Sequence, residues 1–164
     1  AGLLPFGVIS FHLDREHLLP LAAIPVAYAG AQAASGLVAL VNGYAFDRAG
    51  ARVLYVLPVL VALVPPLAFA MTPWVAVAGV LCWGAANGLQ DSTVKALVAD
   101  LVQPARRASA YGVFAAIQGA AAIVGGAAAG LLYERSLPLL IGLVVATQAA
   151  AAVLLRLTLR SVDA

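Results

Sequence analysis

Residues 108–132 read ASAYGVFAAIQGAAAIVGGAAAGLL, a stretch without a charged side chain. A helix needs about 20 mostly apolar residues to cross the hydrocarbon core of a bilayer, so this stretch predicts a transmembrane helix. Residues 1–13 would form only about 20 Å of helix, and we expect them to be the outer end of a first span that begins upstream. The sequence predicts an all-α, polytopic transmembrane bundle, one domain over residues 1–164, with one truncated span and five full spans. The other four full spans are 20–44, 53–71, 73–97 and 136–157.

The composition excludes a soluble globular domain. Of the 164 residues, 64% are hydrophobic and 10% are charged, whereas about 25% of the residues of a soluble domain are charged. The net charge of +2 is a small basic excess that sets membrane topology, and we expect no nucleic-acid partner. Cys82 is the only cysteine, so the chain cannot form an internal disulfide. Because the sequence has neither a P-loop nor a cluster of reactive or metal-ligating residues, we expect no enzymatic activity, no cofactor and no metal.

Basic residues are distributed unevenly between the two ends of the predicted spans. Alternate connectors lie on the same side of a membrane, and one side collects seven of the nine Lys and Arg residues. Because positively charged connectors stay in the cytoplasm, we expect the C-terminus and the connectors at 46–52 and 100–107 to be cytoplasmic. The alanine-rich composition favours a bacterial protein of the inner membrane. The seven residues are Arg48, Arg52, Lys95, Arg106, Arg107, Arg156 and Arg160, and the other two are Arg15 and Arg135.

Three predicted spans carry polar side chains at helical spacing. A helix surrounded by lipid gains nothing from such residues, so we interpret them as lining a cavity or coupling transport to an ion. The alternative is that they bond across helix interfaces, where a hydrogen bond averages about 0.6 kcal/mol. The spans at 53–71 and 136–157 are nearly bare, and we expect them to face lipid. The candidates are Tyr28, Gln32, Ser35 and Asn42 on the 20–44 span, Asn87, Gln90, Asp91 and Lys95 on the 73–97 span, and Gln118 on the 108–132 span.

Small residues also recur at helical spacing. Gly84 and Gly88 form a G-x-x-x-G pattern, and so do Gly126 and Gly130. Small residues let the backbones of two membrane helices approach closely. We therefore expect these glycines to be packing positions.

The connector over residues 43–52 reads GYAFDRAGAR. It resembles the G-x-x-x-D-R-x-G-R-R segment of the major facilitator superfamily, which lies between the second and third helices of each six-helix half. Ala51 stands where a basic residue is usual, as is common in the second-half copy. The stretch at 106–114, RRASAYGVF, is similar to the start of the fifth helix of that half. The matching residues of this motif segment are Gly43, Asp47, Arg48, Gly50 and Arg52.

This resemblance covers nearly the whole chain and implies the C-terminal six-helix half of a transporter. It implies secondary active transport of a small solute by alternating access, with this chain forming one half of the pathway. The partners would be the lipid bilayer, the N-terminal six-helix half and an unidentified small-molecule substrate, with proton coupling as one option. The resemblance also implies that the first, second, fourth and fifth helices of the half line the cavity, with the third and sixth outside. The alternative is a non-transporting membrane scaffold or assembly subunit.

Within the motif segment, each residue type suits a local role. Gly50 can adopt a positive φ for a sharp turn at no steric cost. Asp47 can cap a helix N-terminus, where unpaired N–H groups favour negative charge. Arg48 and Arg52 can bind headgroup phosphates, and the resemblance implies that the segment is a cytoplasmic latch between the two halves.

Two further residues admit alternative interpretations. An acid at the centre of a spanning helix costs about 2.5–3.5 kcal/mol, so Asp91 requires a reason. It could couple protons, or it could form a stabilising i,i+4 ion pair with Lys95, which is the interpretation that we favour. His12 could relay protons, but we expect it to belong to a solvated outer-loop cluster with the charged residues at 14–17.

Overall fold

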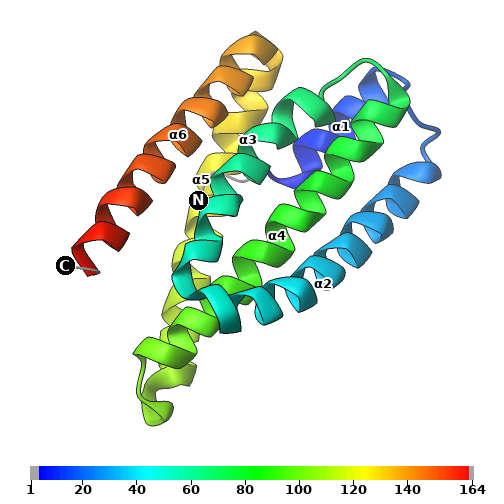
Figure 1. Ribbon diagram of the computed structural model, residues 1–164. Coiled ribbons are helices and arrows are strands. Elements are labelled where there is room, and N and C mark those ends of the chain that lie inside the picture. The colour runs from blue at the N-terminus through cyan, green and yellow to red at the C-terminus, as the bar shows by residue number, and fades with distance from the viewer. Residues whose placement is uncertain (1–3, 163–164) are drawn as a thin grey trace.

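The computed structural model describes residues 4–162 and gives the backbone alone for residue 51 and residues 158–162. This part of the chain contains six α-helices, two 3₁₀ helices and no strand, which confirms the all-α class (Figure 1). The side chains of Ala51 and Arg160, which entered the motif and topology predictions, lie outside the described residues. The helices are α1 Phe6–Arg15, α2 Ala23–Ala49, η1 Gly50–Tyr55, α3 Val56–Ala68, α4 Pro73–Leu101, η2 Pro104–Arg106, α5 Arg107–Arg135 and α6 Leu137–Val162.

Fewer helices than predicted have the length and apolarity of a full span. Within the described residues, three segments meet both criteria: 23–49, 104–135 and 137–157. Helix α3 is about 20 Å long on its own and reaches about 30 Å only together with η1. Helix α4 has 29 residues, but its second half carries charged residues that lower its hydropathy. These two segments therefore differ from the predicted full spans at 53–71 and 73–97.

Helix α2 extends five residues beyond its predicted end at residue 44. It ends where Gly50 adopts a φ of 58°, so the positive φ predicted for this glycine is confirmed. No proline or glycine interrupts residues 45–49, and the helix therefore continues through Asp47 and Arg48. These two motif residues lie on the last turn of a helix and not in a loop.

Helix α4 lies at the centre of the bundle, with α2 on one side and α3 on the other (Figure 1). Gly84 and Gly88 face α2, where an added Cβ would overlap the backbone carbonyl groups of Ala31 and Ser35. Gly79 faces the backbone of α3 in the same way. The predicted packing role of the first G-x-x-x-G pattern is confirmed, and α2, α3 and α4 form one closely packed layer.

Helices α5 and α6 pack more loosely against this layer. Helix α6 contacts α3, while α5 contacts α6, α4 and α1. Within the described residues, Ala129 is the only buried residue of α5. At the second G-x-x-x-G pattern, an added Cβ on Gly126 would lie 3.2 Å from the Pro5 side chain, and one on Gly130 would meet open space.

Candidate functional site

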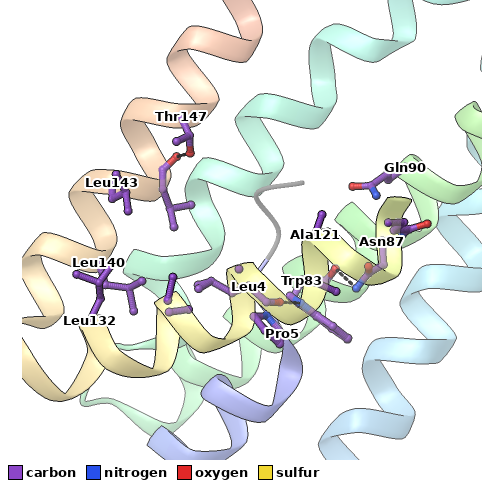
Figure 2. Close-up of a pocket in the computed structure, with 16 residues that line it drawn as sticks. Leu4, Pro5, Trp83, Asn87, Gln90, Ala121, Leu132, Leu140, Leu143 and Thr147 are labelled. Carbon is purple, nitrogen blue, oxygen red and sulfur yellow. Dashed lines mark hydrogen bonds between the residues drawn. The ribbon is translucent and has the colours of Figure 1, made fainter. Parts of the chain in front are cut away.

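A cleft of about 310 Å³ lies between α4, α5 and α6. The residues that precede α1 form part of its wall. Figure 2 shows apolar side chains at one end of the cleft, with Asn87 and Gln90 at the other. We call it the amide cleft, and its lining residues are Leu4, Pro5, Trp83, Asn87, Gln90, Gln118, Ala121, Ala122, Gly125, Ala128, Ala129, Leu132, Leu140, Leu143, Val144 and Thr147.

Three carboxamides and one hydroxyl supply the polar groups of the amide cleft. Asn87 donates a hydrogen bond to the Trp83 carbonyl at 3.3 Å, and Thr147 donates to the Val144 carbonyl at 2.8 Å. Gln90 and Gln118 form no side-chain hydrogen bond with the described residues. Within the described part of the chain, no charged side chain lines the cleft. Because a carboxamide both donates and accepts hydrogen bonds, these side chains can bind neutral groups of a solute that are either donors or acceptors.

The spacing of residues along α4 explains how one helix serves both the cleft and the packed layer. Trp83, Asn87 and Gln90 are separated by four and three residues, which places them on one face of the helix. Gly84 and Gly88 lie on a different face, against α2. Packing at the glycines therefore fixes the direction in which the amides point.

Trp83 connects the amide cleft to the start of α1. Its indole Nε1 donates to the Leu4 carbonyl at 2.6 Å, and the residue is 8% exposed. The Phe6 ring lies 5.4 Å from the Trp83 ring, centroid to centroid. The first residues of the described chain are therefore held at the wall of the cleft.

The polar residues of α2 lie outside the amide cleft. Asn42 is buried and its amide donates to the hydroxyls of Ser92 and Thr93 on α4, at 2.7 and 2.9 Å. The Tyr28 ring lies tilted against the Phe6 ring, with 4.7 Å between the centroids, and Gln32 is exposed. Asn42 therefore does not line a cavity in this structure. It forms hydrogen bonds across a helix interface, which is the alternative given above for the polar residues of the spans. The physical reason is that α2 packs directly along α4, so α4 covers that part of its polar face.

Asp91 and Lys95 also lie outside the cleft, and both are exposed. Within the described residues they form no ion pair with each other, so the favoured interpretation of a structural pair is wrong. Two exposed side chains at this spacing gain too little from pairing to hold one geometry. A coupling role for Asp91 stays a prediction.

The motif segment occupies the junction between α2 and η1. Gly43 lies within α2, and the guanidinium of Arg48 lies over the Tyr44 ring, 3.5 Å from its centroid. Asp47 is exposed and caps no helix among the described residues, because it lies in the last turn of α2 and not at a helix start. The predicted capping is therefore not found within residues 4–162.

Sequence reasoning missed two features of the site. Helix α6 was expected outside the cavity, but it contributes Leu140, Leu143, Val144 and Thr147 to the cleft. Thr147, one of few polar residues of that span, was the available signal. His12 was expected in a solvated cluster, but it is 1% exposed, because residues far away in the sequence cover it.

Comparisons with known proteins identify the family. The family model described as Major Facilitator Superfamily matches residues 3–163. Uncharacterized proteins of Mycobacterium bovis and of two Mycobacterium tuberculosis strains, CDC 1551 and H37Rv, are 48% identical over 154 residues. The alignment covers 94% of this chain but only 38% of each relative. No solved structure matches. The chain belongs to the major facilitator superfamily, a family of membrane transporters, and is part of an integral membrane protein.

Proposed function

We propose that this chain is the C-terminal half of a secondary active transporter for a small, uncharged solute. The family supports transport, and the 38% share of the relatives' length supports a second half beyond this chain. The observation that carries the substrate class is the amide cleft, whose polar lining groups are uncharged among the described residues. A charged solute would lose its hydration there without finding an opposite charge.

The cleft also favours a solute with one polar and one apolar side. Leu132, Leu140 and Leu143 lie at the end away from Asn87 and Gln90 (Figure 2). Amides at one end can bind hydroxyl, carbonyl or amide groups, and the leucines can cover carbon. Alternating access would proceed by rocking of the two halves around this site.

For orientation, we propose that the motif segment and the C-terminus face the cytoplasm. Arg48, Arg52, Arg106 and Arg107 lie near the α2 C-terminus and the α4–α5 connection, at the same end of the bundle. The mycobacterial relatives support a bacterial cell membrane. A C-terminal fusion to a reporter that is active only in the cytoplasm should give signal in intact cells, and a reporter that is active only outside should not.

Transport by proteoliposomes tests the function. The full-length protein that contains this chain should accumulate at least one neutral solute from a screen, with and without a pH gradient. Gln118→Ala removes an amide from the cleft and should lower the transport rate about tenfold, equivalent to about 1.4 kcal/mol. Gln32→Ala removes an exposed amide outside the cleft and is the matched control.

Two outcomes would contradict the proposal. Equal transport by Gln118→Ala and the unchanged protein would remove the amide cleft as the binding site. If no solute of any charge is carried, and cysteines placed at positions 87 and 118 stay sealed from water-soluble reagents, the alternative of a membrane scaffold would be favoured.

A further inference from the structure

Three helices meet at His12, at the end of the bundle opposite the motif segment. His12 lies in the last turns of α1 and is 1% exposed. Its Nδ1 lies 2.7 Å from the Tyr133 hydroxyl near the end of α5. The ring of Phe69, directly after α3, lies at 82° to the imidazole with 5.3 Å between centroids. We call His12, Phe69 and Tyr133 the histidine junction.

One nitrogen of this imidazole is buried without a partner. The backbone of Ala70 lies close enough to hydrogen-bond to a protonated ring, but in the present geometry no group within the described residues forms a hydrogen bond to Nε2. Either neutral tautomer leaves Nε2 unsatisfied, as a donor or as an acceptor. A buried, unsatisfied group typically costs about 1–3 kcal/mol. The apolar contacts alone would be met by a phenylalanine, so the structure retains a titratable group at a cost.

Charged groups surround the junction but do not enter it. Asp14 and Arg15 lie on α1, and Glu16 follows directly after it. Glu16 lies close enough to interact electrostatically with both His12 and Tyr133, and the Arg15 guanidinium lies 5.8 Å from the Phe11 ring centroid. The end of α3 offers only the Phe69 ring and the Ala70 backbone. On α5, the neighbours of Tyr133 are Glu134 and Arg135, which are both exposed.

Protonation of His12 would destabilise the buried position of its ring in the histidine junction. The imidazolium carries a donor on each nitrogen, and the described groups that face it, the Tyr133 hydroxyl and the Ala70 backbone, are both neutral. A buried charge without an opposite charge beside it costs far more than a buried neutral group. Turning outward would give the charged ring water and the Glu16 carboxylate.

We propose that His12 is a proton-binding site, and that loading it from the non-cytoplasmic solution separates α1 from the ends of α3 and α5. This inference rests on the proposed transport function, since it names the proton as the ion that controls the pathway. Histidine suits the role because it titrates near neutral pH.

Helix α1 connects the junction to the amide cleft. Its 10 residues begin two positions after Leu4, which accepts the Trp83 hydrogen bond at the cleft wall, and they end at Arg15, beyond His12. A short helix moves as a unit, so displacement at His12 reaches Leu4. Proton binding at one end of α1 therefore changes the cleft wall at the other end.

Spin-label distances in the full-length protein test the proposal without a known solute. Labels on cysteines at the exposed positions Asp14 and Leu139, in a background with Cys82 and any other cysteine replaced, report the separation of α1 from the α5–α6 connection. From pH 8 to pH 5, the ratio of separated to closed molecules should rise by up to about tenfold per pH unit, the limit for one linked proton. The transition should fall within a few units of the ordinary histidine pKa of about 6.5.

Three variants assign the pH response. His12→Gln cannot be protonated and should show a distance that does not change with pH. His17→Gln replaces an exposed histidine five residues away and should behave like the unchanged protein. Tyr133→Phe keeps the ring but removes the 2.7 Å hydrogen bond, so the closed state loses stability and the transition should move to higher pH.

The outcomes separate this proposal from the proposed function. A pH-dependent distance that survives in His12→Gln, or no pH dependence in the unchanged protein, would overturn the proton site. If His12→Gln does not yield folded protein, the midpoint shift of Tyr133→Phe decides, and no shift overturns the proposal. A protein that carries no solute would contradict the transport function, yet the pH dependence of its spin-label distances would still test whether His12 is the proton-binding site.

Discussion

Helices α2 and α5 are both long and apolar, but they differ in how much of their surface this chain covers. Helix α2 packs along α4 at backbone contact through Gly84 and Gly88. Helix α5 has a single buried residue, Ala129, within the described part. Hydrophobicity does not bring helices together inside lipid, where close packing and hydrogen bonds do. Apolarity therefore keeps both helices in the membrane. The glycines of α4, spaced to meet the backbone of α2, explain why α2 and not α5 is closely packed within this chain.

The largest loss of stability should come from placing a side chain between α2 and α4. Gly84→Leu places a side chain where even a Cβ would overlap the Ala31 carbonyl. Overpacking of a core typically costs about 1–3 kcal/mol, and a backbone overlap should lie at or above the top of that range. Thermal unfolding of the purified full-length protein should show a large loss of stability or no folded protein. Gly112→Leu, on α5 with open space around it, is the control. An equal loss of stability in this variant would contradict the difference in packing between α2 and α5.

A smaller effect should follow from removing the polar link between the same two helices. Asn42→Ala deletes the hydrogen bonds to Ser92 and Thr93, and bonds of this kind in membranes average about 0.6 kcal/mol each. We expect a loss of about 1–2 kcal/mol in the free energy of unfolding, measured by titration with denaturing detergent. Gln32→Ala, exposed on the same helix, should be near neutral. A stability equal to that of the unchanged protein would show that the glycine contact alone holds α2 to α4.

The smallest effect is expected on α5. Among the described residues nothing lies within 4 Å of a Cβ added to Gly119. Gly119→Ala should therefore raise the unfolding free energy of the full-length protein by about 0.5–1 kcal/mol, because glycine loses more conformational freedom in a helix than alanine does. The same thermal measurement serves here. A loss of several degrees in melting temperature would instead show that a segment outside this chain packs against α5 at backbone distance, which would place α5 in the same class as α2.

The sequence predicted the class of the fold and the positions that are set by local chemistry. Long uncharged runs require helices in lipid, because every backbone polar group must be satisfied within its own segment. The turn at Gly50 needed only the steric freedom of glycine, and Gly84 and Gly88 needed only their spacing.

The placement of polar side chains was less predictable, because periodicity shows which residues share a face but not what covers that face. Asn42 was grouped with cavity candidates, and α4 covers it. Asn87, Gln90 and Gln118 do line the cleft. His12 is buried by Tyr133, which lies 121 residues later, a contact that no local pattern in the sequence indicates.

The six residues of η1 make the third segment longer than an α-helix of the same number of residues would be. A 3₁₀ helix rises about 2.0 Å per residue and an α-helix about 1.5 Å, so conversion of Gly50–Tyr55 would shorten this segment by about 3 Å. Natural bilayers differ in hydrocarbon thickness by a few Å. The 3₁₀ winding of one short stretch therefore adds to the third segment a length of the same order as the difference in thickness between natural bilayers.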